Sequence, residues 1–344
     1  MKKCKSSAAV LFGVWGVLLL LLFAANLFRG SVDVPFLSVF DILTGGDGGN
    51  EGWRLIVAET RFPQAVTALF AGASLSVAGL LLQTLFSNPL AGPEVLGINS
   101  GAGLGVAVVM LLLQGVVAAG AASLGGYVAV LCGAFVGALC IILIVLALSS
   151  LLSNNIFLLI AGLAISYLTS SVISLLNYFS TAEGVHSYLI WGMGSFGGVS
   201  LGHLPLFVTV TGSMLLWALL MVKPLNALLL GNNYARNLGV DTKRVRAALL
   251  LIVGVLTAAV TAFCGPIAFL GLAVPHLARL AVGTENHRVL LPVTILLGSS
   301  VALLCNLVCQ LPGAGGLLPL GAVTPVIGAP VIIYVVLKDK ALRR

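Results

Sequence analysis

Few residues in this chain have side chains and spacings that could carry out chemistry. No Gly-x-x-x-x-Gly-Lys-Ser/Thr sequence is present to hold ATP phosphates, and no His-Glu-x-x-His sequence is present to hold zinc. Cys305 and Cys309 share a helix face four residues apart, but two thiols without a nearby histidine or carboxylate form a poor metal site, so packing is the favoured interpretation. The sequence therefore predicts no catalytic residue, no metal site and no cofactor, and an intramembrane enzyme is the weakest class considered.

Ionisable residues that could pass a proton or an ion through a membrane are also scarce. Between Phe62 and Val222 the charged residues are Glu94 and Glu183. A relay normally needs buried carboxylates or histidines. His276 is the remaining candidate, and its position near the end of an expected span favours a structural hydrogen bond. A secondary transporter coupled to ions or protons is therefore an alternative without a clear relay.

The composition shows which elements must position these residues. Of 344 residues, 60% are hydrophobic and 8% are charged, and the mean hydropathy is +1.16. Soluble domains carry about a quarter charged residues. A hydrocarbon core about 30 Å thick is crossed by about 20 apolar helical residues, whose backbone bonds are satisfied internally. The prediction is an all-α integral membrane protein, with residues 1–344 forming a single polytopic domain.

Ten apolar stretches are long enough to serve as transmembrane helices. They are Ala8–Phe28, Pro63–Phe86, Val95–Leu113, Leu124–Leu148, Ile156–Phe179, Leu204–Val222, Val245–Phe263, Ile267–Val282, Val289–Leu311 and Leu317–Leu337. The first follows three lysines, as a signal peptide would, but its apolar run is too long and lacks a convincing cleavage site, so a retained span is predicted.

Basic residues predict the orientation of these spans, because loops rich in Lys and Arg stay in the cytoplasm. With ten spans and an inner amino terminus, 14 of the 17 basic residues are inside, and only Arg29, Arg54 and Arg61 are outside. Both termini are therefore predicted to be cytoplasmic. The net charge of +7 is explained by this topology, and nothing in it calls for a nucleic-acid partner.

Three polar stretches separate the spans. Residues 29–61 form an acidic, glycine-rich outer segment, predicted to be a surface loop. Residues 180–203 contain five glycines between Gly192 and Gly202 and are predicted to form a bent or broken helix. Residues 223–246 form the longest polar inner segment.

The inner segment contains a short amphipathic sequence with helix boundaries at both ends. Asn232 to Leu238 could form two helical turns that end at Gly239 as a left-handed cap, and Asp241 or Thr242 could cap the next helix. Two interpretations stay open on these residues alone: a basic cytoplasmic loop, or a helix that docks on a cytoplasmic ATPase and passes its movement to the spans.

Four motifs, in order along the chain, resemble signatures of the FecCD-type importer permeases. The first two are Asn88-Pro-Leu-Ala-Gly-Pro-Glu-Val-Leu-Gly97 followed by Gly101-Ala102, and Gly265-Pro-Ile-Ala-Phe-Leu-Gly-Leu-Ala-Val-Pro-His276 with Arg279. The others are His287-Arg-Val-Leu-Leu-Pro292 and Leu318-Pro-Leu-Gly-Ala-Val-Thr324 with Gly328 and Pro330. The resemblance extends from about Arg61 to Leu337, which is nearly the whole chain.

The resemblance implies an ABC importer of iron-siderophores, haem or cobalamin in the bacterial inner (plasma) membrane. It implies a homodimer with a pathway along the dimer axis, two cytoplasmic ATPase subunits and a periplasmic substrate-binding protein. ATP hydrolysis would then belong to the partner subunits. It also favours the docking interpretation of the inner segment, with coupling residues Asn232, Asn233, Tyr234, Ala235, Arg236, Leu238 and Gly239.

Two departures from the family concern docking of the binding protein. The family often has Arg-x-Pro-Arg at the outer start of the second span, whereas this chain has Arg61-Phe-Pro-Gln64. Gln310 similarly occupies a position near the outer end of the ninth span where some members have arginine. Docking is therefore predicted to use Arg54 and a partly exposed Arg61, or less electrostatic contacts.

Asn154 and Asn155 lie in the inner turn before the fifth span, where family members narrow the pathway with small polar side chains. The resemblance thus implies a gate at this pair. An amide-capped turn at the membrane surface is the open alternative, because Asn favours turns and helix starts.

Overall fold

The computed structural model describes residues 2–30, 32–46, 48–112, 124–152, 155–310 and 318–342. Within these ranges every regular element is a helix, which confirms the predicted all-α class. The elements are α1 (Lys2–Phe28), α2 (Phe36–Leu43), α3 (Glu51–Leu55), η1 (Ile56–Arg61), α4 (Phe62–Phe86), η2 (Pro93–Leu96), α5 (Ile98–Ala107), η3 (Val108–Leu112), α7 (Leu124–Leu151), α8 (Asn155–Phe179), α9 (Ala182–Gly192), η4 (Phe196–Gly198), α10 (Leu204–Leu220), α11 (Val222–Leu228), α12 (Asn232–Asn237), α13 (Thr242–Cys264), α14 (Leu270–Val282), α15 (His287–Cys309) and α16 (Leu320–Leu342).

Five helical stretches among the described residues are long and apolar enough to cross a membrane. They are Glu51–Phe86, Gly126–Leu151, Ile156–Phe179, Thr242–Cys264 and His287–Cys309. A sixth forms if α10 and α11, which meet at 55°, are taken as one bent span. Shorter apolar helices cover Phe12–Phe28, Ile98–Leu112, Leu270–Val282 and Leu320–Tyr334. Each predicted apolar stretch falls on one of these helices, whereas the number of complete crossings stays a prediction.

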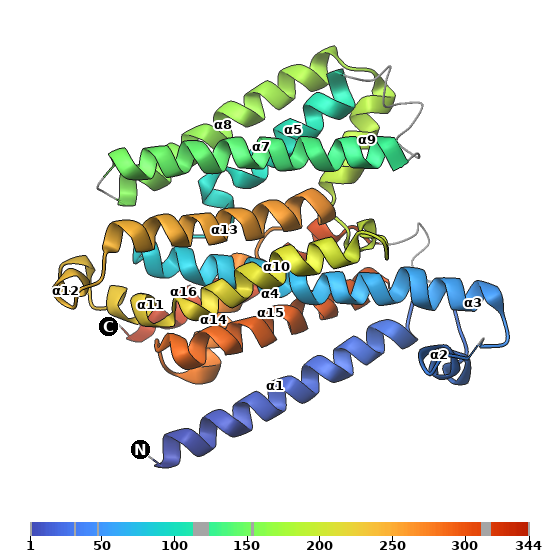
Figure 1. The fold of residues 1–344 in the computed structure, drawn as a ribbon, viewed down its shortest axis with the longest axis horizontal. Coiled ribbons are helices and arrows are strands. Elements are labelled where there is room, and N and C mark those ends of the chain that lie inside the picture. Colours follow the sequence, from blue (N-terminus) through green and yellow to red (C-terminus); the bar gives the residue numbers. More distant parts are fainter. Residues whose placement is uncertain are drawn as a thin grey trace.

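The helices lie side by side, with the predicted inner and outer segments at opposite ends of the bundle. Figure 1 shows α12 and both chain ends at one end, and α2 and α3 at the other. Helices α5, α7 and α8 form one side of the bundle, and α1, α14 and α15 lie on the opposite side of α4 and α13. Helix α12 of the predicted coupling segment and helix α3, which carries Arg54, thus lie at opposite ends of the bundle.

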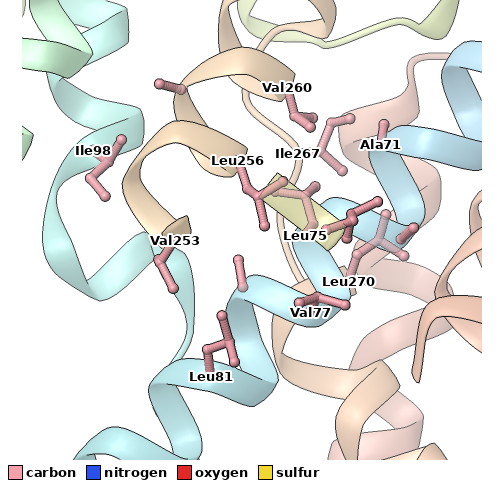
Figure 2. Close-up of a cluster of buried hydrophobic side chains, with 14 of the residues drawn as sticks. Ala71, Leu75, Val77, Leu81, Ile98, Val253, Leu256, Val260, Ile267 and Leu270 are labelled. Atoms are coloured by element: carbon pink, nitrogen blue, oxygen red, sulfur yellow. The ribbon is translucent and has the colours of Figure 1, made fainter. Parts of the chain in front are cut away.

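Helix α4 belongs to the most enclosed of the five long apolar stretches. It packs against α10, α13, α14 and α15, and its most apolar stretch is 83% buried, compared with 17% for α8. Figure 2 shows part of the resulting core, in which Leu75 and Leu81 of α4 lie with Val253 and Leu256 of α13. The neighbours of α4 therefore separate it from lipid, whereas α8 has a broad uncovered surface.

Several helix crossings among the described residues are close enough to require glycine, and two are the tightest. A Cβ on Gly79 of α4 would lie 1.7 Å from the carbonyl oxygen of Gly271 in α14. A Cβ on Gly105 of α5 would lie 1.9 Å from the carbonyl oxygen of Gly133 in α7. Larger residues at these positions would push the helix backbones apart, because close backbone contact is what holds helices together in lipid.

The two outer segments contain more helix than loop. Residues 29–61, predicted as a surface loop, include α2, α3 and η1, and η1 continues directly into α4. That loop prediction is wrong because Asn50 caps α3, its Oδ1 accepting from the N–H of Gly52 at 2.8 Å, and the helix then runs on. Residues 180–203 form the predicted broken helix, in which α9 ends at Gly192 and a turn leads to η4.

Candidate coupling segment and gate

The predicted coupling segment folds as the short helix α12, followed by Leu238 and Gly239. Gly239 has a φ of +81°, and its N–H donates to the carbonyl oxygen of Arg236 at 2.9 Å. The N–H of Val240 donates to the carbonyl oxygen of Ala235 at 3.0 Å. This pair of bonds is the Schellman motif, which ends a helix at a left-handed glycine. The predicted glycine cap is confirmed.

The side chains of α12 divide into one anchor and an exposed surface. Ala235 is fully buried, whereas Tyr234 and Leu238, one turn apart, are 53% and 58% exposed. Leu230, just before the helix, is 61% exposed. Contiguous exposed apolar side chains mark interaction sites. The end of the bundle therefore has a surface suited to a protein partner.

Side-chain hydrogen bonds attach α12 to the helix that follows it. Nε of Arg236 donates to Oγ1 of Thr242 at 2.9 Å. Oδ1 of Asp241 accepts from the N–H groups of Lys243 and Arg244, each at 3.1 Å. Asp241 is thus the N-cap of α13, one of the two predicted candidates. Arg236 thus joins α12 to the first residue of α13.

The predicted gate, Asn154 and Asn155, falls largely outside the described residues. Asn154 is outside the described residues, and Asn155 begins α8 with a side chain that is also outside them. Just before this pair, the carbonyl oxygen of Leu152 accepts a hydrogen bond from Nη1 of Arg246 at 3.0 Å. Arg246 belongs to the first turns of α13. The coupling segment and the approach to the predicted gate are therefore joined through α13.

The two predicted docking residues have different environments. Arg54 is exposed on α3. Arg61 is only 3% exposed, and its Nη1 donates to the carbonyl oxygens of Leu27 at 2.9 Å and Phe28 at 3.0 Å. The expectation of a partly exposed Arg61 is wrong, because its guanidinium satisfies carbonyls that the end of α1 leaves without helical partners.

Gln64 and Gln310 belong to a partly buried chain of amides that the sequence did not reveal. Nε2 of Gln310 donates to Oε1 of Gln64 at 3.3 Å, and Nε2 of Gln64 donates to Oδ1 of Asn306 at 3.0 Å. Nδ2 of Asn306 then donates to Oδ1 of Asn26 at 2.7 Å. The chain links α1, α4 and the end of α15. Glutamine at the two departures from the family thus joins α4 to the end of α15.

The ionisable groups considered for a relay are bonded to backbone. Oε1 of Glu94 accepts from the N–H of Phe269 at 3.2 Å, and Phe269 has a φ of +68° at the start of α14. Nε2 of His276 lies 2.8 Å from the carbonyl oxygen of Pro89. The predicted structural hydrogen bond of His276 is confirmed. Each side chain thus attaches a backbone group of one segment to another segment of the chain. This structural role needs no proton transfer.

Two other chemical possibilities receive no support from the described residues. Cys305 and Cys309 are buried in α15, and the described residues include no group of three or more His, Cys, Asp or Glu side chains placed to hold a metal ion. Gly198 to Gly202 has the Gly-x-Ser-x-Gly spacing of a hydrolase elbow, which requires a strand-to-helix turn. Here Ser200 precedes α10, and its carbonyl accepts from the N–H of Leu204 at 3.0 Å, as at an ordinary helix start.

Comparison with known proteins agrees with this architecture. The profile of the FecCD transport family matches residues 18–338. The vitamin B12 import system permease protein BtuC of Klebsiella pneumoniae subsp. pneumoniae is 37% identical over 287 residues, which cover 83% of this chain and 84% of that protein. The protein of the same name from Escherichia coli O6:H1 is 38% identical over 293 residues, which cover 85% and 87%. An inward-facing metal-chelate-type ABC transporter of known structure matches with a TM-score of 0.82 at 28% identity, covering 96% of this chain and 99% of that one.

The apolar helices and the matches to permeases define a membrane-embedded transport permease. The chain belongs to the FecCD transport family, since the family profile and the relatives both cover most of its length. It is a multi-pass protein of the bacterial inner membrane and a permease of the ABC importer type. In this family, ATP hydrolysis takes place on a separate subunit.

Proposed function

We propose that residues 1–344 form one polytopic permease domain that imports cobalamin, a ferric siderophore or haem. Two such chains assemble with two cytoplasmic ATPase subunits and a periplasmic substrate-binding protein. The observation that carries the proposal is α12, a capped helix with exposed Tyr234 and Leu238 at the end of the bundle that holds both chain ends. In this proposal the ATPase subunit binds α12 and moves it during ATP hydrolysis.

Helix α8 supplies the proposed wall of the pathway. Tyr167, Ser171, Ser174 and Tyr178 share one face at helical spacing, and all four are exposed in the single chain. The hydroxyls of Ser171 and Ser174 each donate to a carbonyl oxygen one turn earlier, at 3.0 Å. Two α8 helices facing each other across a dimer would enclose a weakly polar passage without charge. A bulky chelate or corrinoid could then pass without being held by an ion pair.

The alternative, a secondary transporter, has little support from the ionisable side chains of the described residues. Such a transporter needs intramembrane ionisable groups that can change their protonation or bind an ion. Glu94 and His276 instead hold backbone groups of Phe269 and Pro89. The structure thus supports an external energy source more than an ion gradient.

The proposal is tested by reconstituting the chain with its ATPase and binding protein in liposomes. Cobalamin, a ferric siderophore and haem are each added to the binding protein outside, and ATP hydrolysis and uptake are measured together. We expect one of the three to stimulate hydrolysis and to accumulate only when ATP is supplied inside. The substrate-free binding protein is the control. Accumulation driven by a proton gradient in the absence of ATP would contradict the proposal.

A further inference from the structure

A cavity of about 290 Å³ lies between α12, the first turns of α13 and the end of α7. Its lining combines two kinds of side chain. Arg236, Lys243 and Arg246 provide three positive charges, and Leu85, Leu146 and Leu228 provide apolar surface. The described lining residues include no carboxylate. The cavity is therefore suited to a molecule with an anionic group and an apolar part.

The guanidinium of Arg246 has hydrogen-bonding capacity that the described residues do not use. Its Nη1 donates to the carbonyl oxygen of Leu152, whereas Nε and Nη2 are inaccessible to solvent and have no hydrogen-bond partner among the described residues. Leaving buried donors of a charged group without partners is costly. An anion in the cavity could accept from these donors once the guanidinium turns toward it.

The carboxylate next to the lining residues Thr242 and Lys243 in sequence already has partners. Asp241 caps α13 and forms an ion pair with Arg244 at 3.0 Å. Arg244 does not line the cavity. The amino-terminal end of α13 adds the partial positive charge of its helix dipole. The basic lining residues and the start of α13 thus favour binding of an anion in this cavity.

We infer that this cavity binds the phosphate group of an anionic phospholipid. The cavity lies at the end of the bundle that the basic residues predict to be cytoplasmic, where anionic lipids and basic pockets between helices meet. The leucines would contact the apolar part of the lipid. The inference rests on the proposed orientation of the permease. A bound lipid would bridge α12 and α13 to the segment that leads to the predicted gate, so its presence would strengthen the mechanical link between them.

The binding can be measured on the full-length chain in detergent, without its partners, by native mass spectrometry during titration with phosphatidylglycerol or phosphatidylcholine. We expect phosphatidylglycerol to bind more tightly than phosphatidylcholine, with one high-affinity site per chain. Arg246→Gln should weaken this binding about fivefold or more, as should Lys243→Gln, since each removes one charge next to the lipid phosphate. Arg244→Gln is the matched control and should leave it unchanged.

Several outcomes would overturn the inference, and none depends on transport activity. Equal affinity for the two lipids, or equal losses for the Arg244 and Arg246 variants, would remove the lipid site. Binding of inorganic phosphate or ATP to lipid-free protein with the same residue dependence would assign the cavity to a soluble anion. An anionic-lipid site that appears only with the ATPase subunit present would assign it to the complex and not to this chain. If Arg246→Gln does not fold, Lys243→Gln decides, because Lys243 is exposed and its loss leaves the α13 cap intact.

Discussion

Arg61 donates a hydrogen bond from Nη1 to the carbonyl oxygen of Leu27, 2.9 Å away and 34 residues earlier in the chain. The bond closes the end of α1 against the last turn of η1. Arginine suits this position because its five N–H donors can satisfy several carbonyls at once. A basic residue that the charge pattern places outside thus serves the fold of the outer end.

Replacing Arg61 with methionine is expected to destabilise the permease by about 1–3 kcal/mol, because the carbonyls at the end of α1 lose a charged donor in a buried site. Thermal unfolding of the purified chain in detergent measures this loss. Arg54→Met is the control, since Arg54 is exposed and its variant should lose less stability than the Arg61 variant. Equal unfolding temperatures for the Arg61 variant and the wild type would show that the bond adds nothing.

Of the two predicted docking residues Arg54 is the exposed one, and we expect it to contact the binding protein. Arg54→Ala should lower the association rate at low ionic strength, because exposed charges at an interface mainly steer encounter. The difference should vanish at about 1 M salt, where the Debye length is about 3 Å. Surface plasmon resonance with the permease in nanodiscs would measure both rates. Identical rates at low salt would exclude Arg54 from the interface.

A Glu94 variant distinguishes the proposed ATP-driven importer from the alternative, a proton-coupled secondary transporter. Glu94→Gln keeps an oxygen that can accept from the N–H of Phe269, so uptake driven by ATP should be largely retained. A proton relay through Glu94 would instead be abolished by the same change. Gly92→Ala is the structural counterpart, since its Cβ would lie 2.3 Å from Oε2 of Glu94 and displace the carboxylate. Gly92→Ala should therefore lower the unfolding temperature of the permease, whereas Glu94→Gln should leave it nearly unchanged.

Gly239 can be tested without steric ambiguity. A Cβ at this position meets no atom within 4 Å, so its φ of +81° is the only constraint on the side chain. Gly239→Val should strain the cap and lower substrate transported per ATP hydrolysed, because a β-branched residue disfavours the left-handed conformation. Gly239→Asn, which tolerates that conformation, should retain most coupling. Normal transport per ATP in the valine variant would show that the cap is not part of the coupling path.

Local signals account for the parts of the structure that the sequence predicted. Apolar length placed the helices, and a glycine after a short amphipathic stretch and an aspartate before the next placed the ends of α12 and α13. Arg61 and the amide chain depend on partners that are distant in sequence: Asn306 and Asn26, bonded to each other, are 280 residues apart. No local pattern distinguishes such a buried amide or arginine from an exposed one. The helical outer segment was missed because its glycines outweighed the cap at Asn50.

The gate prediction concerns Asn154 and Asn155, which should face their counterparts in a second protomer near the cytoplasmic end of the dimer axis. The bond between Arg246 and Leu152 strengthens the case, because it attaches the preceding residues to the helix that follows α12. Cysteine at each position, in a background without the six native cysteines, should crosslink between protomers and block uptake, and ATP binding should change the yield. Asn232→Cys is the control, since this residue lies in the coupling segment and should not reach its counterpart. Absence of crosslinks at positions 154 and 155 in every nucleotide state would leave these residues as a capped turn before α8.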